Sequence, residues 1–135
     1  MPEISIKLRS VPDTAAAIGW SGPHSLTVDR PPGVARGGGL GFNGGELLAL
    51  AIGGCFCNDL HYVATAQGIE LTSLSVDVTL ELSGDPPLAT AARMAVNATA
   101  AEAEADIQAV ITQAKATSTV SNSLARGLAV EVARV

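Results

Sequence analysis

The chain has 135 residues, of which 47% are hydrophobic but only 3% aromatic, and its formal net charge is −5. This length suits a single domain over residues 1–135, with a core of closely packed Ala, Val, Leu and Ile side chains. The eight basic residues form no run. The sequence therefore lacks the concentrated basic patch that nucleic-acid binding requires.

The start of the chain and its apolar stretches give an expectation about location. Residues 1–5 lack the basic and apolar regions of a signal peptide. The longest apolar stretch, residues 47–57, is shorter than the ~20 residues that cross a bilayer, and Asn58 and Asp59 interrupt it. We therefore expect a soluble, cytoplasmic protein that binds no membrane.

The N-terminal part predicts a small antiparallel sheet followed by a loop. Residues 4–9 alternate apolar and polar side chains, and residues 14–18 and 24–29 predict two further strands separated by turn signals. Residues 30–45 are rich in Gly and Pro and predict a flexible connection without regular structure. Their glycines do not match phosphate-loop spacing, so we expect no nucleotide or other cofactor.

An almost wholly apolar segment follows the loop and contains both cysteines, Cys55 and Cys57. It predicts a helix over residues 46–67. A helix that is apolar on every side has no solvent face, so we expect it to be buried in the fold or in an interface. Gly53 and Gly54 each cost about 1 kcal/mol relative to alanine in a helix. Close approach of another backbone beside Cys55 would explain why glycine occupies both positions despite this cost.

The second half predicts a hairpin, a helix and a last strand. Residues 74–82 and 92–98 alternate apolar and polar side chains, with a turn between them. Acidic residues precede a segment, 107–114, whose apolar residues recur at helical spacing. Residues 127–135 alternate again and predict a final strand. This order of elements indicates an α+β domain.

Two side-chain pairs on the central helix bear on the reactivity of the thiols. Residues four apart share a helix face, so Cys55 pairs with Asp59 and Cys57 pairs with His61. A carboxylate disfavours a neighbouring thiolate, whereas an imidazole takes the proton or stabilises the charge. Local geometry alone therefore favours Cys57, and activation of Cys55 needs a cation from elsewhere, for which the candidates are Arg30, Arg36 and Arg126.

Other interpretations of the two cysteines stay open or are excluded by geometry. Free cysteine is among the most frequently buried residue types, so packing alone is an alternative role for both thiols. Neighbours at i and i+2 on a helix point apart, which excludes a disulfide between them and favours a reducing compartment. Cys55, Cys57 and His61 match no standard ligand spacing, and we expect no metal.

The residues and the order of the elements together resemble the OsmC/Ohr family, the osmotically inducible and organic hydroperoxide resistance proteins. The likeness covers nearly the whole chain. It is carried by residues 43–48 leading to Gly54-Cys55-Phe56, by Gly68-Ile69 before an alternating strand, and by residues 114–124 before the last strand. The resemblance implies an OsmC-like fold and an intertwined homodimer, with the cysteine helices at its centre and active sites at the subunit interface.

The resemblance also implies a thiol peroxidase that reduces organic hydroperoxides in oxidative stress defence. Cys55 falls on the family's reactive cysteine, which becomes a sulfenic acid when it reduces the peroxide. The family's resolving cysteine corresponds to Ser118, so the implied cycle is of one-cysteine type. An external thiol or Cys57 would then reduce the sulfenic acid.

Two more positions differ from the family pattern. Gly45 stands where the family has its catalytic glutamate, and Glu46, one residue later, is the candidate for that role. The family's arginine has no match near residues 19–22, so Arg30 or Arg36 would replace it. These departures leave two other functions open: a non-catalytic dimer that binds a hydrophobic small molecule or a partner, and a redox sensor that is oxidised at Cys55 without turnover.

Overall fold

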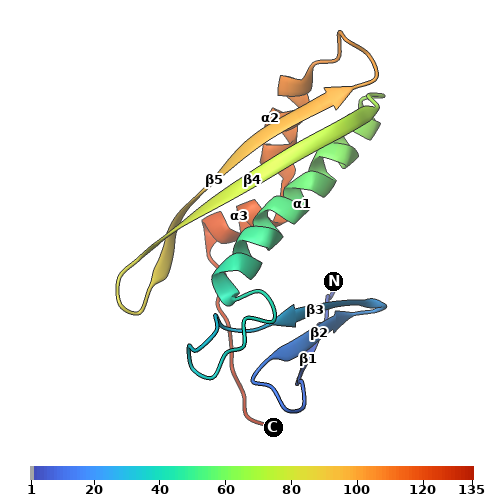
Figure 1. The fold of residues 1–135 in the computed structure, drawn as a ribbon. Coiled ribbons are helices and arrows are strands. Elements are labelled where there is room, and N and C mark those ends of the chain that lie inside the picture. Colours follow the sequence, from blue (N-terminus) through green and yellow to red (C-terminus); the bar gives the residue numbers. More distant parts are fainter. Residues whose placement is uncertain (1) are drawn as a thin grey trace. The chain divides into compact units, whose positions relative to one another are not determined.

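The computed structural model describes residues 2–135, which form two compact units that divide between Leu48 and Ala49. Each unit is described by itself. The elements are three short strands, a long helix, a two-stranded hairpin and two helices, in that order along the chain (Figure 1). This mixture of antiparallel strands and helices confirms the predicted α+β class.

The N-terminal unit contains an antiparallel sheet in the order β1-β2-β3. Its strands are β1 (Lys7–Ser10), β2 (Ala17–Ser21) and β3 (His24–Val28). The sheet was predicted, but β1 and β2 each begin three residues later than expected. Residues 11–16 form a turn instead of a strand, because the N–H of Thr14 and its hydroxyl both donate to the carbonyl of Val11.

The Gly/Pro-rich loop after β3 is more ordered than predicted. The backbone N–H of Asp29 donates to the carbonyl of Phe42 at 3.0 Å, and the N–H of Phe42 donates to the carbonyl of Thr27 at 3.1 Å. These bonds bring Phe42 beside Val28 in a parallel bridge and close the loop at its base. The prediction of a flexible connection is therefore wrong at this base, because backbone pairing holds both ends of the loop together.

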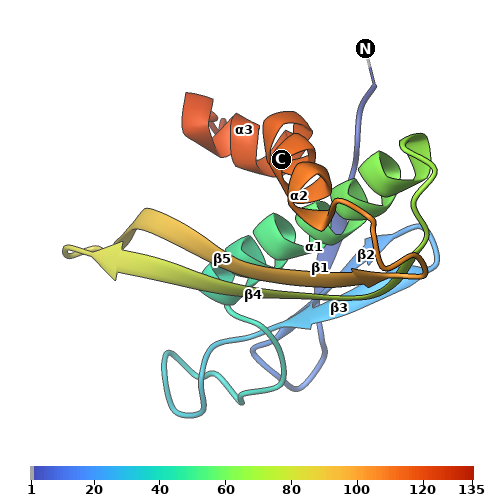
Figure 2. The same cartoon turned by 90° about the horizontal axis from the view of Figure 1, so that it is seen from above.

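The C-terminal unit is built on a long hairpin. Strands β4 (Leu71–Ser83) and β5 (Leu88–Ala100) pair antiparallel, with Val76 opposite Val96 and Val78 opposite Met94. The helices that belong with this hairpin are α1 (Gly44–Ala66), α2 (Ile107–Thr117) and α3 (Thr119–Arg126). Figure 2 shows α1 and α2 on one face of the hairpin. The predicted positions of α1, the hairpin and α2 are confirmed.

The core of this unit lies between the hairpin and the two helices α1 and α2. Its buried members are Phe56, Leu60, Val63 and Ala64 from α1, and Val110 and Ala114 from α2. The half-buried face of the hairpin, which includes Val76, Met94 and Val96, packs against them. The alternation in the sequence therefore marks the strand face that covers the helices.

The glycine pair in α1 has an explanation at one position only. A Cβ atom on Gly53 would lie 2.7 Å from Cγ2 of Val78, so this glycine lets a side chain of β4 approach the helix. The expected approach of another backbone is thus corrected to the approach of a side chain. A Cβ atom on Gly54 would meet no atom of residues 2–135 within 4 Å.

The C-terminal part differs from the prediction in two places. Residues 127–135 form no strand, because neither strand of the hairpin pairs with them and a strand needs a hydrogen-bonded neighbour. Residues 119–126 form a helix, α3, a segment for which no regular element was predicted. The eight-residue segment has only three apolar side chains, Val120, Leu124 and Ala125, which are too few to predict a helix from the sequence.

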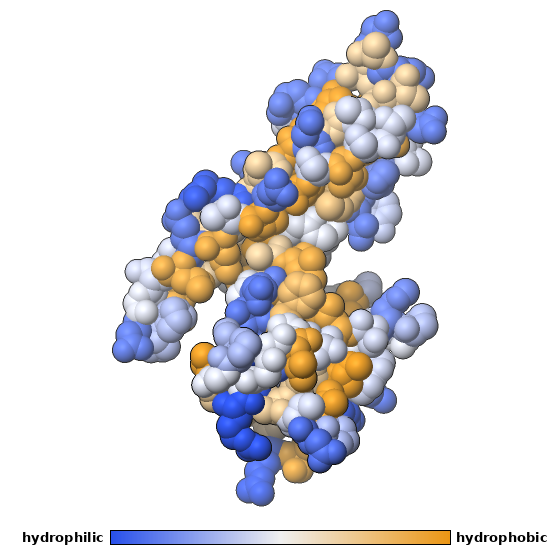
Figure 3. Space-filling model, in the orientation of Figure 1, coloured by the Kyte–Doolittle hydropathy of each residue, from blue (hydrophilic) through white to orange (hydrophobic). Residues whose placement is uncertain are grey.

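The central helix is buried on one side rather than all round. Its buried residues are Ile52, Gly53, Phe56, Leu60, Val63 and Ala64, whereas Leu50 is 48% exposed and Tyr62 is 71% exposed. The helix α1 is long and apolar enough to cross a membrane, but the core helices of soluble proteins share this length and composition. In the space-filling view, apolar surface extends over the region of β4, β5 and α1 (Figure 3).

Candidate active site around Cys55

The candidate site is a three-residue contact centred on the sulfur of Cys55. Cys55 is a free, half-buried cysteine in the fourth turn of α1. Its thiol donates to Oδ2 of Asp59 at 3.5 Å, and the hydroxyl of Ser118 donates to its Sγ at 3.7 Å. All three residues belong to the C-terminal unit. The sulfur therefore has a carboxylate acceptor and a hydroxyl donor as neighbours.

The contact with Asp59 follows from helix geometry. Residues i and i+4 of an α-helix lie one above the other on the same face, which places the carboxylate over the preceding turn beside the thiol. The sequence predicted this pair, and the structure confirms it. The other predicted pair differs, since no hydrogen bond joins Cys57 to His61 in the part of the chain that the structure describes, and His61 is exposed.

Ser118 reaches Cys55 because it stands at the junction of α2 and α3. It occupies the N-cap position of α3 with an extended backbone, yet its hydroxyl makes no capping bond. The hydroxyl points to Cys55 instead, and the residue is fully buried. A Ser at an N-cap normally bonds to the helix backbone. Here the hydroxyl of Ser118 forms a tertiary contact instead, because Cys55 lies 63 positions away in the sequence.

Asn122 fixes this junction and had no role in the sequence prediction. Its side-chain amide donates to the carbonyl of Ser118 at 2.6 Å, and also to the carbonyls of Lys115 and Ala116 at the end of α2. The carbonyl of Ser118 also accepts the backbone N–H of Asn122 at 3.1 Å, so the backbone and the side chain of Asn122 both bind it. The last carbonyls of a helix such as α2 usually lack a partner within the helix. By binding them, Asn122 holds the backbone of Ser118 in place.

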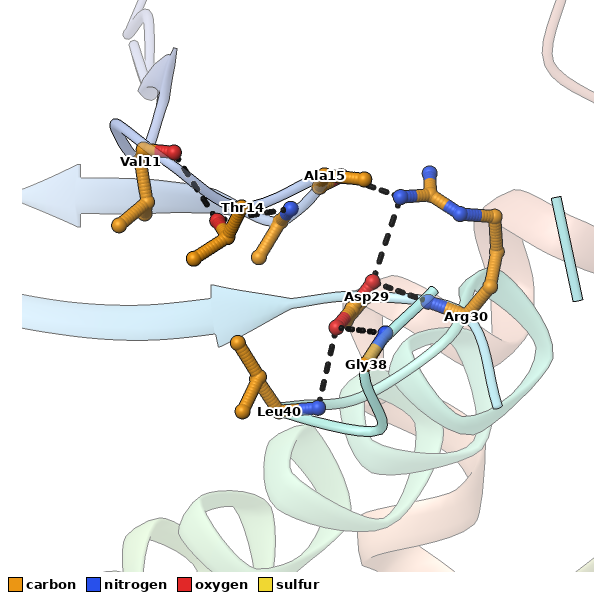
Figure 4. A network of polar contacts seen from close by, with 8 residues as sticks. Val11, Thr14, Ala15, Asp29, Arg30, Gly38 and Leu40 are labelled. Carbon is orange, nitrogen blue, oxygen red and sulfur yellow. Dashed lines mark hydrogen bonds and ion pairs between the residues drawn. The ribbon is translucent and has the colours of Figure 1, made fainter. Parts of the chain in front are cut away.

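Arg30, one of the predicted cations, is engaged within the N-terminal unit. Its Nη2 donates to Oδ1 of Asp29 at 3.2 Å and to the carbonyl of Ala15 (Figure 4). Its Nε is buried without a hydrogen-bond partner among residues 2–135. The guanidinium therefore connects the loop to the turn before β2.

Asp29, which the sequence did not single out, is the centre of this network. The residue is buried, and its Oδ2 accepts from the N–H groups of Gly38 and Leu40, both at 3.0 Å (Figure 4). Its Oδ1 accepts from the N–H of Arg30 at 2.8 Å. The N–H of Leu40, followed by those of Arg30 and Gly38 and by the Arg30 charge, lowers the pKa of Asp29 against the opposing effect of burial.

The other two predicted site residues also belong to the N-terminal unit. Arg36 is exposed and has a left-handed backbone, with φ of 66°. Glu46 accepts the N–H of Asn43 on its Oε1 at 3.0 Å, while Oδ1 of Asn43 accepts the N–H of Glu46 at 2.9 Å. This reciprocal pair is a capping box at the start of α1. Roles for Arg30, Arg36 and Glu46 at the thiol stay predictions.

The arrangement around Cys55 can support nucleophilic chemistry at sulfur. The hydroxyl of Ser118 can stabilise negative charge on the sulfur, and the carboxylate of Asp59 can accept the proton of the thiol. Position 118 holds an oxygen, so no second thiol is present there to form a disulfide. The free thiol Cys57, two residues from Cys55, is half-buried on the same helix.

The comparisons with known proteins identify the fold. An OsmC-like protein from Mycoplasma pneumoniae matches with a TM-score of 0.74 and 19% identity, covering 92% of this chain and 88% of that one. An organic hydroperoxide resistance protein OsmC from Legionella pneumophila matches with a TM-score of 0.63 and 20% identity, covering 92% and 90%.

A third solved structure, the organic hydroperoxide resistance protein OhrB of Bacillus subtilis, has a TM-score of 0.52 and 20% identity, with coverage of 90% and 89%. The sequence matches no curated protein. At these identities the structural likeness establishes the fold alone. The model of the family described as OsmC-like protein, however, matches residues 37–133, more than half of the chain. The protein therefore belongs to the OsmC-like family.

Proposed function

We propose that the protein is a thiol-dependent hydroperoxide reductase of one-cysteine type that acts on organic hydroperoxides in oxidative stress defence. The observation that carries this proposal is the free thiol of Cys55, which lies in contact with a buried hydroxyl and a carboxylate. Membership of the OsmC-like family and the names of the structural neighbours from Legionella pneumophila and Bacillus subtilis support the same chemistry.

The proposed cycle has two stages. The sulfur of Cys55 attacks the terminal oxygen of the hydroperoxide, which forms a sulfenic acid and releases an alcohol. An external thiol then displaces water to give a mixed disulfide, and a second equivalent of that thiol restores Cys55. Ser118 cannot take the resolving role, because an alcohol does not undergo thiol exchange. We place this activity in the reducing cytoplasm, which supplies such thiols.

The experiment is a titration of the purified protein with cumene hydroperoxide, in which a dimedone probe traps sulfenic acid and peptide mass spectrometry locates it. We expect stoichiometric oxidation at Cys55 and turnover when an external dithiol is added. The Cys57→Ser variant is the matched control and should keep both. If Cys55→Ser consumes the peroxide as fast as wild type, the proposed activity is wrong.

A binding function is the second candidate, and its available site is a largely open surface depression of about 340 Å³ beside the end of α1 and beside α2. It is lined by Tyr62, Val63, Ala66, Gln67, Gln113 and Thr117. An unreactive Cys55 in the titration, together with saturable binding of an apolar fluorescent probe, would favour this function. Stoichiometric oxidation without any turnover would instead favour a redox sensor.

We also propose that the protein acts as a homodimer. Leu50 and Gly54 leave one side of α1 uncovered in this chain, and Leu128, Val130 and Val132 are exposed in a segment with strand-like alternation. Both outer edges of the hairpin lack a paired strand among the described residues. A second copy would cover the apolar side of α1 and could pair the C-terminal segment with a free edge.

Light scattering during size-exclusion chromatography tests the dimer. Wild type should have the mass of two chains, and Leu50→Glu should shift it towards one chain, because a charge is then placed in the proposed interface. Val34→Glu is the control, since Val34 is an exposed residue of the N-terminal loop. A wild-type mass of one chain at micromolar concentration would contradict the proposal.

A further inference from the structure

We propose that Asp59 carries the proton during the reaction of Cys55 with a hydroperoxide. This inference rests on the proposed function and adds a catalytic residue to it. The carboxylate is in direct contact with the reacting atom, since its Oδ2 lies 3.5 Å from the Cys55 sulfur and accepts the thiol hydrogen. The family resemblance gave no role to this position.

The surroundings of Asp59 leave its carboxylate available to the thiol. Asp59 is half-buried, and the bond from Cys55 is its only side-chain hydrogen bond within residues 2–135. No Lys or Arg forms an ion pair with it in that part of the chain. A carboxylate that is already engaged by a cation would be a poorer proton acceptor, so this isolation suits a proton carrier.

The proton has a defined route. As the sulfur attacks the terminal peroxide oxygen, the S–O bond forms, the O–O bond breaks, and the thiol proton passes to Asp59. The sulfur loses two electrons and the peroxide gains them, which leaves a sulfenic acid and an alkoxide. Asp59 then returns the proton to the alkoxide as an alcohol leaves. Asp59 thus acts first as a general base and then as a general acid, and it ends the reaction in its starting protonation state.

Ser118 has a complementary role on the same sulfur. Its hydroxyl donates to Sγ at 3.7 Å while Asp59 accepts from the thiol, so the two groups give the sulfur one donor and one acceptor. As the thiol proton leaves, the donated hydrogen bond stabilises the charge that develops on sulfur. Ser118 is fully buried, which keeps water from replacing this bond.

The test compares oxidants whose leaving groups differ in their need for a proton. Asp59→Asn keeps the shape of the side chain but cannot carry a proton. With cumene hydroperoxide, which leaves as an alkoxide, we expect the rate of Cys55 oxidation to fall about 100-fold, within the range of general acid–base catalysis. With peracetic acid, whose acetate leaves without protonation, the loss should be less than tenfold.

Two further variants keep the test decisive. Asp59→Glu retains a carboxylate and should recover part of the rate with cumene hydroperoxide, which a merely structural role would not require. Asp77→Asn changes an exposed carboxylate of β4 and should oxidise like wild type. If Asp59→Asn loses the same factor with both oxidants, or reacts as fast as wild type, the role of Asp59 is overturned. Resistance of wild-type Cys55 to cumene hydroperoxide would instead overturn the proposed function.

Discussion

The hydroxyl of Ser118 lies 3.7 Å from the sulfur of Cys55, although 63 positions separate the two residues in the chain. The contact depends on the α2–α3 junction, which Asn122 holds through three backbone carbonyls. The side chain at position 118 is thus within reach of the thiol. A cysteine at this position could form a disulfide with the sulfenic acid of Cys55, whereas a serine cannot.

The first prediction concerns Ser118→Cys, which should create a two-cysteine peroxidase. The new sulfur would lie next to Cys55, and a small side-chain rotation would bring the two sulfurs to bonding distance. One equivalent of cumene hydroperoxide should then give a disulfide between position 118 and Cys55 instead of a trapped sulfenic acid. Non-reducing peptide mapping measures this product.

Ser121→Cys is the matched control for this disulfide. Ser121 is half-buried in α3 but forms no hydrogen bond with Cys55 within residues 2–135. Its variant should accumulate sulfenic acid at Cys55 as wild type does. If the Ser118→Cys protein also retains two free thiols and a stable sulfenic acid after oxidation, the inferred proximity of the two side chains in solution is wrong.

The second prediction concerns the packing of α1 on β4. Gly53→Ala should lower the free energy of unfolding by about 1–3 kcal/mol, because the added Cβ would lie 2.7 Å from Cγ2 of Val78 and overpack the core. Alanine is otherwise the better helix former by about 1 kcal/mol. Urea unfolding followed by circular dichroism measures the change.

Removal of the opposing methyl groups tests the cause of this destabilisation. In the double variant Gly53→Ala/Val78→Ala, the two changes should cost less than the sum of their separate effects, since the shorter side chain at position 78 makes room for the added Cβ, and that Cβ fills part of the cavity that Val78→Ala leaves. Strict additivity would show that the contact between positions 53 and 78 is not the source of the effect.

Much of the fold could be predicted from the sequence because its signals are local. The alternation of apolar and polar residues in β4 and β5, and the helical spacing of apolar residues in α2, are visible within a short stretch of sequence. These elements were confirmed. The pair Cys55 and Asp59 is local in the same way. What failed is non-local: residues 127–135 need a pairing partner to be a strand, and residues 2–135 provide none.

The candidate site shows the same limit. The proximity of Ser118 to Cys55 could be suspected only through the family resemblance, since no periodicity connects residues on α1 and at the α2–α3 junction. Asp29 was missed altogether, because a single Asp beside an Arg and a Gly-rich loop resembles an ordinary surface sequence. Its importance comes from backbone N–H groups that converge on it only after the loop closes.

The third prediction concerns the start of α2. Oδ1 of Asp106 accepts the N–H of Ala109 at 3.0 Å and caps the helix. Asp106→Ala should lower the free energy of unfolding by about 0.5–2 kcal/mol, because the N–H loses its partner. Urea unfolding measures it, with Glu104→Ala as the control for loss of a nearby negative charge. An equal effect of both variants would assign the change to charge rather than to capping.

The fourth prediction concerns the acid stability of the N-terminal unit, where the N–H of Leu40 is the largest of the influences that lower the pKa of Asp29. A carboxyl group whose pKa is lower in the folded state stabilises that state above its unfolded pKa of about 3.9. This contribution disappears as the pH falls through the folded value. At neutral pH it should therefore be fully present, and below about pH 4 it should decline.

Asp29→Asn should consequently destabilise the N-terminal unit most at pH 7, and the difference from wild type should shrink as the pH falls below about 4. The fluorescence of Trp20, the single tryptophan of the chain, reports on this unit because it lies in β2. Urea titrations of both proteins at pH 7, 5 and 3 measure the effect, with Asp13→Asn as a control. A difference that stays constant over this range would mean that the ionised carboxylate of Asp29 does not stabilise the loop.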